Sequence, residues 1–479
     1  MLIRNASILF QQPTDLRIER GAIAEIGNGL RESRDEEVVD AQAAALLPGL
    51  SDHHLHLRSL AAALSSLPCG PPKVRDADGL TLALRQASDD PARQPSEWIR
   101  GVGYHGSVAG DIDRDWLDRV LPGRATRIQH RSGRLWILNS RALELIGAQD
   151  ATGDDPLERI DGRLTGRLYD ADTWLRARLG SPHQNLHAVS HRLAGFGITG
   201  VTETTPSNGH DELMYFQLAR QRGELLQDVL VMGNASLDEI TPPPNPLPQG
   251  EGGVWRGPRK FHLRDAALPE LGEVCAGIEA SHRFRRSVAF HCVTRAELVF
   301  TLVALREAGS IAGDRIEHAS ITPPDLLSQI AELGLTVVSQ PNFIAERGDA
   351  YLQAVADEDQ PWLYRLRGFL DRGIPLAGST DAPFGDVNPW KSMQAAVTRR
   401  AASGAVIGAD ETLSPEEALG LFLSPLDMPG RRVREIVPGM PADLCLLDRP
   451  WVEARQNLAN VQVQLTLKAG QPIWHQGTN

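Results

Sequence analysis

Cysteine is scarce in this chain, with four cysteines among 479 residues and no two of them in a CxxC pair. This usage indicates neither a disulfide framework nor a cysteine-rich metal site, and it favours a reducing cytoplasm. Runs of 18 or more apolar residues are also lacking, which excludes a transmembrane helix. Residues 1–12 have no long apolar stretch ending in a cleavage site, so we expect no signal peptide. GxGxxG and GxxxxGK[ST] patterns are absent, which removes the simplest nucleotide-binding interpretations.

Basic residues are too few for a protein that binds polyanions. Lys and Arg number 49 against 61 Asp and Glu, a formal net charge of −12. Neither nucleic acid nor an anionic membrane would be attracted to such a chain. The apolar content of 42% and charged content of 23% are ordinary for a globular protein with a sizeable core. We therefore expect a cytoplasmic protein whose partner is a small molecule, and the composition is compatible with a homodimer.

Strand-like segments occupy both ends of the chain. Near the C-terminus, the segment VQVQLTLKAGQPIW alternates apolar and polar residues as a half-buried strand does. Between the two ends, apolar bursts such as SVAFHCV and LTVVSQP are separated by helical patterns. Alternating strands and crossover helices favour a parallel sheet, and at this length a (β/α)8 barrel. We predict an α/β fold with a barrel over residues 52–427 and a small β-sandwich formed by residues 1–51 and 428–479.

Two stretches do not fit the repeating pattern. Residues from about 60 to 190 are too many for a single strand-to-helix connection, so we expect an insertion with helices of its own. Residues 241–253, TPPPNPLPQGEGG, are rich in proline and glycine. We expect an exposed, mobile loop there with no catalytic role.

The segment LLPGLSDHHLHL ends an apolar run with His54 and His56. On a strand, residues i and i+2 point to the same face, so both imidazoles can reach one ion, whereas His53 points to the other face. Two histidines on one strand form half of a site for zinc or a similar metal. The spacing alone is weak evidence, because H-x-H also arises by chance.

Further polar residues lie at the ends of other predicted strands. These are Lys260 at the start of KFHL, His291 after SVAF, His318 after DRIE, and Asp381 after PLAGST. Taken singly, each has an ordinary explanation: a packed histidine, a lysine with its amine in solvent, or an aspartate in a turn. Strand ends of a barrel converge on one mouth, however, and the joint occurrence of these residues predicts one site there.

With these residues in place, the sequence resembles the amidohydrolase superfamily of metal-dependent hydrolases over nearly its whole length. The segments WIRGVGYHGSVAGDIDRDWLD, NSRALELIG and GFGITGVTE look like its "amidohydrolase 3" branch, which includes N-substituted formamide deformylases. The resemblance implies a barrel, a side β-sandwich and one or two divalent metal ions, with Zn²⁺ expected. By position, the metal ligands would be His54, His56, His291, His318 and Asp381, and Lys260 would bridge two ions when carboxylated.

The chemistry of these residue types fits hydrolysis. Neutral imidazoles and a carboxylate hold a metal while leaving a position for water, whose pKa falls from 15.7 toward about 7. Asp381 would bind metal, accept the proton of the attacking water, and return it to the leaving amine. An uncharged lysine cannot bridge two cations, but its carbamate can, so the number of ions depends largely on Lys260.

The chain departs from the branch at two places. The branch usually has K-x-x-x-D-G after the lysine, whereas here the run from Lys260 to Asp265 contains no glycine. The branch also places a histidine before its N-S motif, where this chain has Arg134, a residue that could pair with a substrate carboxylate or with a nearby acid such as Glu203. Three further residues are candidates for contact with substrate. Tyr104 and His105 lie in the insertion, and Gln340 lies at a strand end.

The leading hypothesis is a metal-dependent hydrolase that cleaves a non-peptide C–N bond of a small molecule, in an amide, formamide or cyclic amide. One alternative is ester or phosphoester hydrolysis at the same metal site. Another is a non-catalytic binding protein on a degenerate barrel, which the presence of all five ligand candidates disfavours. Fold alone does not choose between these chemistries.

Overall fold

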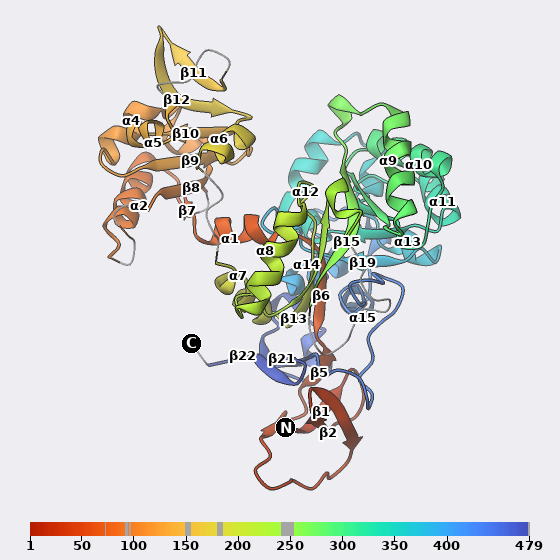
Figure 1. The fold of residues 1–479 in the computed structure, drawn as a ribbon. Coiled ribbons are helices and arrows are strands. Elements are labelled where there is room, and N and C mark those ends of the chain that lie inside the picture. The colour runs from red at the N-terminus through yellow and green to blue at the C-terminus, as the bar shows by residue number, and fades with distance from the viewer. Residues whose placement is uncertain are drawn as a thin grey trace. The chain divides into compact units, whose positions relative to one another are not determined.

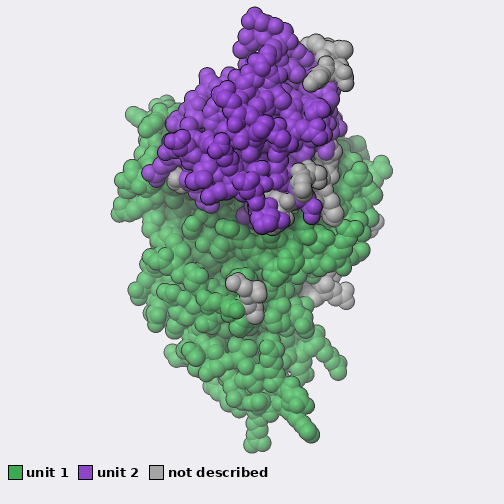
Figure 2. All heavy atoms as spheres, turned by 90° about the vertical axis from the view of Figure 1, so that its left-hand side faces the viewer, with its two compact units in different colours: residues 1–57, 185–479 green, residues 58–184 purple. Residues whose placement is uncertain are grey.

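The computed structural model describes residues 1–71, 73–91, 94, 97–148, 155–179, 185–240 and 253–477. The chain divides into two compact units, coloured separately in Figure 2. Unit 1 comprises residues 1–57 and 185–479, and unit 2 comprises residues 58–184. Residues 241–252 are outside the described part of the chain, so the expectation of an exposed loop there stays a prediction.

Unit 1 contains a nearly closed barrel of eight parallel strands (Figure 1), which confirms the predicted α/β barrel. Neighbouring strands are paired in the order β6 (Leu50–Leu55), β13 (Ile198–Glu203), β14 (Asp228–Gly233), β15 (Val254–His262), β16 (Val288–Cys292), β17 (Arg315–His318), β18 (Thr336–Ser339) and β19 (Leu376–Gly378). Strands such as β6, β17 and β18 are buried along their whole length, as expected of parallel strands covered on both faces.

The first and last strands approach each other just beyond β19. The backbone N–H of Asp381 donates to the carbonyl of His54 at 2.9 Å, and the N–H of His56 donates to the carbonyl of Ala382 at 2.9 Å. Asp52 adds a side-chain link, because its carboxylate accepts hydrogen bonds from the N–H and hydroxyl of Thr380 at 3.2 and 2.6 Å. These contacts join the two ends of the barrel sheet beside residues predicted to bind metal.

Helices connect the barrel strands and are capped by their own sequence. The α10 helix begins after a capping box formed by Thr294 and Glu297 and ends at Gly309, whose φ of 83° suits glycine. The helices of unit 1 are α7 (His187–Ala194), α8 (His210–Gln221), α9 (Leu271–Arg283), α10 (Arg295–Ala308), α11 (Pro324–Glu332), α12 (Asn342–Ala354), α13 (Arg367–Asp371), α14 (Pro389–Thr398), α15 (Pro415–Gly420) and α16 (Trp451–Ala454).

The two ends of the chain form one mixed sheet of eight strands, which lies below the barrel in Figure 1. Its strands are β1 (Leu2–Ile8), β2 (Thr14–Glu19), β3 (Ala22–Gly27), β4 (Val38–Asp40), β5 (Ala45–Pro48), β20 (Leu444–Leu447), β21 (Val463–Lys468) and β22 (Gln471–His475). β1 pairs with β2 from Leu2 to Ala6, with β4 at its start and with β5 at its end. Apolar residues from both chain ends share one core, including Ile3, Leu46, Leu444 and Leu465. The predicted limits of this region, 1–51 and 428–479, stay a prediction.

Unit 2 has a six-stranded sheet in the order β11 (Leu157–Ile160), β12 (Arg163–Tyr169), β10 (Leu135–Leu138), β9 (Thr126–His130), β8 (Ile99–Tyr104) and β7 (Leu67–Pro68). Its helices are α1 (Leu57–Leu64), α2 (Ala77–Asp89), α3 (Gly106–Ala109), α4 (Arg114–Val120), α5 (Ser140–Leu145) and α6 (Asp172–Leu179). Apolar side chains of α2, α4 and the sheet, such as Leu84, Leu117 and Ile128, pack into a core of their own. Across both units, no helix within the described ranges has the length and apolarity needed to cross a membrane.

Candidate functional site

Candidate metal ligands from different strands meet at the C-terminal end of the barrel. They are histidines at the end of β6, an imidazole of β17 and a carboxylate that follows β19. His54 is the fifth residue of β6, and His56 follows the strand directly. The Nε2 atoms of His54 and His56 lie 3.5 and 3.4 Å from the same oxygen, Oδ1 of Asp381. The strand alternation predicted from the H-x-H spacing therefore brings both rings to one carboxylate.

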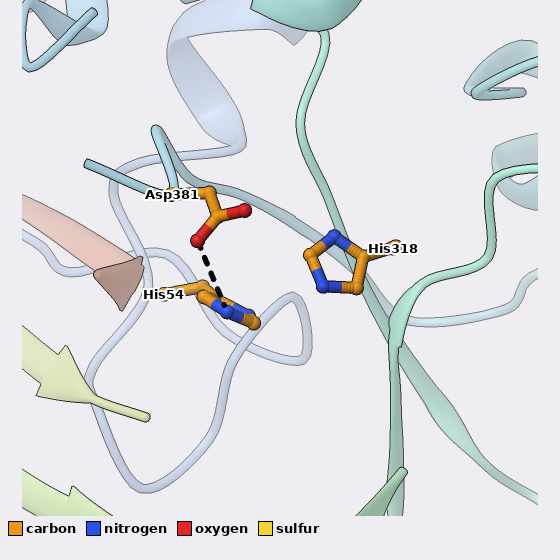
Figure 3. A group of neighbouring side chains, drawn as sticks. All are labelled: His54, His318 and Asp381. Atoms are coloured by element: carbon orange, nitrogen blue, oxygen red, sulfur yellow. Dashed lines mark ion pairs between the residues drawn. The ribbon is translucent and has the colours of Figure 1, made fainter. Parts of the chain in front are cut away.

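His54, His318 and Asp381 each offer a ligand atom, and these three atoms lie within 4.8 Å of one another (Figure 3). In a tetrahedral zinc site with bonds of 2.0–2.1 Å, neighbouring ligand atoms are about 3.4 Å apart. The distances from Asp381 Oδ1 to the two imidazoles match that value. This oxygen is buried and has no hydrogen-bond partner in the described part of the chain, which fits an atom that is turned toward a cation.

The other nitrogen of each imidazole is engaged by a neighbouring side chain. Nδ1 of His54 lies 2.5 Å from a carboxylate oxygen of Glu317, and Nδ1 of His318 lies 2.7 Å from the amide oxygen of Gln340. Nδ1 of His56 lies 2.8 Å from the hydroxyl of Thr205. Because Nδ1 donates to an acceptor in the first two cases, Nε2 is left with its lone pair, the arrangement typical of metal-binding histidines.

The electrostatic surroundings keep the imidazoles neutral and the carboxylates ionised. Burial, and then the neighbouring His54, lower the pKa of His318 to about 3, and burial also lowers the pKa of His54. Burial alone would raise the pKa of Asp381, but His54, His56 and His318 outweigh it and hold this pKa at about 2. Neutral imidazoles and an ionised carboxylate are the forms that bind a metal ion.

Glu317 is fully buried on β17 between two positive groups. Burial would raise its pKa, yet Arg315, Lys260 and His54 hold the pKa well below its usual range. The Nε of Arg315 lies 2.5 Å from Oε1 of Glu317, and a second nitrogen of Arg315 donates to the carbonyl of His53 at 2.7 Å. Glu317 therefore links the charge of Arg315 to the orientation of His54.

Lys260 is buried inside the barrel near the C-terminal end of β15. The strand starts at Val254, six residues earlier than the predicted start at Lys260, so the side chain lies closer to the mouth than the sequence indicated. Its Nζ has no hydrogen-bond partner among the described residues. Burial, opposed by the charges of Glu317 and Asp381, lowers the pKa of Lys260 to about 8.

His291 borders this cluster on β16. Its ring centroid is 4.6 Å from that of His318 and 4.3 Å from that of His262 on β15. His262 pairs with His291 in the strand register and lies two residues beyond Lys260 on the same face. The cluster of three atoms within 4.8 Å includes neither His291 nor His56. His262 was not among the residues predicted from the sequence, although it lies in the run where the chain departs from the branch pattern.

The family model described as "Amidohydrolase family" (Amidohydro_3) matches residues 37–474. The chain belongs to the amidohydrolase family. It is 26% identical over 499 aligned residues to an N-substituted formamide deformylase of Arthrobacter pascens, covering 91% of this chain and 89% of that protein. The expected branch is thereby confirmed, and the chain is a metal-dependent hydrolase of this superfamily.

Solved structures share the fold of this amidohydrolase at low sequence identity. An uncharacterized metal-dependent hydrolase from Pyrococcus horikoshii superposes with a TM-score of 0.77 at 20% identity, covering 98% of this chain and 99% of that one. The atrazine chlorohydrolase TrzN from Arthrobacter aurescens, complexed with zinc, gives a TM-score of 0.59 at 14% identity, covering 99% and 95%. These likenesses establish the barrel architecture.

Two ligand candidates of the amidohydrolase site have unusual backbone conformations. His318 has a φ of 69° and Asp381 a φ of 54°. A left-handed conformation in a residue other than glycine costs about 1–2 kcal/mol and occurs preferentially at functional sites. The strain is offset by barrel contacts, such as the hydrogen bond from Asp381 to the carbonyl of His54.

Gln340 directly follows β18 and lies next to His318. Its side chain is fully buried; the amide oxygen faces His318, and the amide nitrogen donates to the hydroxyl of Ser379 at 2.9 Å. Both the oxygen and the nitrogen of the amide are therefore engaged by other side chains of the protein. This placement fits a residue that positions His318, and contact of Gln340 with substrate stays a prediction.

The three candidates from the insertion lie in unit 2. Tyr104 is buried in that unit's core, and its hydroxyl donates to the carbonyl of Gly110 at 2.6 Å, which indicates packing. His105 is half-buried, with Nδ1 2.9 Å from the hydroxyl of Ser107. Arg134 is bound by both oxygens of Asp170, at 2.8 and 2.5 Å. Its acidic partner is thus Asp170, which the sequence did not indicate, and substrate contact by His105 or Arg134 stays a prediction.

Proposed function

We propose that this amidohydrolase cleaves a non-peptide C–N bond of a small molecule, in an amide, formamide or cyclic amide. The observation that carries the proposal is the unpartnered Asp381 Oδ1, which lies 3.4–3.5 Å from the Nε2 atoms of His54 and His56. A carboxylate at that position can both bind a cation and exchange a proton with the reacting groups. The relative named N-substituted formamide deformylase supports an amide as the substrate.

The residues present fit a divalent cation. His54, His318 and Asp381 would hold it, because one ligand atom of each lies within 4.8 Å of the other two. His56 would join them through Nε2, which lies 3.4 Å from Asp381 Oδ1. Bound there, a cation such as Zn²⁺ would lower the pKa of water and polarise the carbonyl of the substrate. Imidazole and carboxylate ligands suit zinc, and the proposed ion is Zn²⁺.

A second cation would need an anionic bridge from Lys260. Its buried, unpartnered Nζ and its pKa of about 8 support carbamate formation, since the neutral amine is the form that reacts with CO₂. His291 on the adjacent strand β16 and His318 on β17 would supply imidazole ligands for that ion. Whether the chain holds one ion or two would therefore depend on whether this lysine is carboxylated.

Asp381 would move the proton. One oxygen of the carboxylate is turned to His54 and His56, and the carboxylate as a whole is ionised at neutral pH because its pKa is about 2. It would accept the proton of the attacking water as the new C–O bond forms. It would then return this proton to the nitrogen as the C–N bond breaks, so that the products are a carboxylic acid and an amine.

The test begins with the purified protein and its metal content. We expect at least one Zn²⁺ per chain, loss of activity after chelation, and recovery after Zn²⁺ is added back. A panel of acylated amines and matched esters with the same acyl groups would then be compared by kcat/KM. Hydrolysis of esters or phosphoesters alone would support the alternative chemistry, and binding without turnover would support a non-catalytic protein.

A further inference from the structure

A large apolar side chain stands beside the candidate metal ligands. Phe384 lies on the loop that follows Asp381 at the C-terminal end of the barrel, and 57% of its surface is exposed. Its ring meets that of His56 edge to face, with the centroids 5.3 Å apart and the planes at 87°. The rest of the ring is free to contact a molecule bound at the site.

The loop that carries Phe384 is held tightly. The N–H of Phe384 donates to the carbonyl of Asp381 at 2.8 Å, and its own carbonyl accepts a hydrogen bond from Arg347 on α12 at 2.6 Å. Gly385 is packed so closely that a Cβ atom would come within 2.2 Å of the Asn342 amide and 2.3 Å of the Thr380 carbonyl. These contacts hold the backbone of Phe384 next to the candidate ligands.

This combination differs from the exposed apolar residues found on any protein surface. A single exposed phenylalanine generally needs no explanation. Here the backbone that carries the ring is held by hydrogen bonds, the ring contacts the ligand candidate His56, and Phe384 lies three residues from the proposed proton donor. On the other side of the cluster, β15 and β16 present the imidazoles of His262 and His291. The mouth thus has an apolar side near Asp381 and a polar side near β15.

The position of Asp381 determines which part of a substrate would meet the ring. In the proposed reaction Asp381 returns its proton to the leaving nitrogen, so that nitrogen must approach Asp381. A substituent on the nitrogen then projects toward the loop after Asp381, while the acyl carbon is held between the ligands.

We infer that Phe384 is a specificity-determining residue that packs against an apolar substituent on the leaving nitrogen. The inference rests on the proposed function and names its substrate class: amides of apolar primary amines, with an aryl or branched alkyl group on the nitrogen. Aromatic rings gain affinity from burying apolar surface and from edge-to-face contacts with a second ring.

The test compares a series of formamides that differ only in the nitrogen substituent, from methyl through isobutyl to benzyl. We expect the wild-type kcat/KM to rise along the series. Phe384→Ala should lower the ratio of benzyl to methyl by about tenfold or more, and Phe384→Leu should retain most of it. Phe284→Ala is the matched control, because Phe284 is also exposed (42%) but follows α9 before the start of β16. We expect the benzyl-to-methyl ratio of kcat/KM in this variant to equal that of the wild type.

The outcomes separate the inference from the proposed function. If neither this series nor any acylated amine of the panel described above is hydrolysed, the proposed function fails, and the inference fails with it. If amides are hydrolysed and Phe384→Ala leaves the benzyl-to-methyl ratio unchanged, the role of Phe384 is refuted while the function stands. Zinc content is measured in every variant, since a loss of metal from Phe384→Ala would show that the ring only supports His56, and would also overturn the inference.

Discussion

The Nδ1 atom of His54 lies 2.5 Å from the carboxylate of Glu317, a residue 263 positions later in the chain. The acid lies on β17 and the imidazole on β6, so the contact crosses the interior of the barrel. It fixes the tautomer of His54 with the proton on Nδ1 and leaves Nε2 for an ion. Partners of this kind affect metal affinity almost as strongly as the ligands themselves.

Glu317→Gln should therefore weaken metal binding by about 10- to 100-fold, because glutamine removes the charge that holds the proton on Nδ1 of His54. The free energy of unfolding should also fall, since the buried charge of Arg315 loses its counterion. Zinc affinity would be measured by competition with a chelating dye, and stability by denaturant unfolding of the metal-free protein.

Glu411→Gln supplies the matched control for that experiment. Glu411 is also buried and pairs with an arginine, Arg365, at 2.7 Å. We expect a similar loss of stability in this variant with zinc affinity unchanged. Equal loss of zinc affinity in both variants would contradict a specific role of Glu317 at His54.

Asp381→Asn tests the proposed proton transfer. The amide cannot take up the proton of water, so we expect kcat to fall by about 10²- to 10⁴-fold, with weaker metal binding because a charged ligand is lost. Assays at saturating zinc separate the two effects. Asp371→Asn, an exposed aspartate next to Arg367, should leave both quantities unchanged, and an Asp381→Asn protein with wild-type kcat at full zinc occupancy would refute the mechanism.

The sequence predicted the barrel and the convergence of the ligand candidates because both follow from local patterns. The alternation of β6 places His54 and His56 on one face. His318, the last residue of β17, and Asp381, which follows β19, lie at the barrel mouth. The closeness of His318 and Asp381 to His54 then follows from the convergence of strand ends in a barrel.

The partners of the imidazoles could not be predicted in this way. Glu317, Thr205 and Gln340 are ordinary polar residues in the sequence, and their pairing with a histidine depends on strand tilt and side-chain rotation across the barrel. Gln340 illustrates the limit: the strand pattern correctly placed it at a strand end, but only the three-dimensional packing shows that its amide faces His318 and Ser379.

The depressed pKa of Lys260 leads to a prediction about pH and CO₂. With a pKa of about 8, about a tenth of the amine is neutral at pH 7 and about nine-tenths at pH 9. Carbamate forms from the neutral amine, so carboxylation in bicarbonate buffer should increase over this range. The pKa of His318 is about 3, so this ligand is neutral throughout and adds no pH dependence above pH 7.

The measurement is carbon-13 NMR with labelled bicarbonate, combined with the zinc content of metal-free protein reconstituted at each pH. A carbamate signal that grows from pH 7 to 9, with a second zinc ion that requires bicarbonate, is the expected result. Lys260→Ala should lose both, whereas Lys391→Ala, which removes an exposed lysine paired with Asp386, should retain both. Occupancy by two ions in bicarbonate-free buffer would contradict a bridging carbamate.

Gln340→Met tests whether this residue positions His318 or contacts substrate. Methionine fills a similar volume but cannot accept the hydrogen bond from Nδ1 of His318, so the ring loses its fixed orientation. We expect zinc affinity to fall by about tenfold, while KM measured at saturating zinc stays within about twofold of wild type. Gln340→Glu, which keeps an acceptor oxygen for Nδ1, should recover most of the affinity. A raised KM with normal zinc binding in Gln340→Met would instead support the substrate contact that the sequence suggested, and would show that the amide leaves His318 when substrate binds.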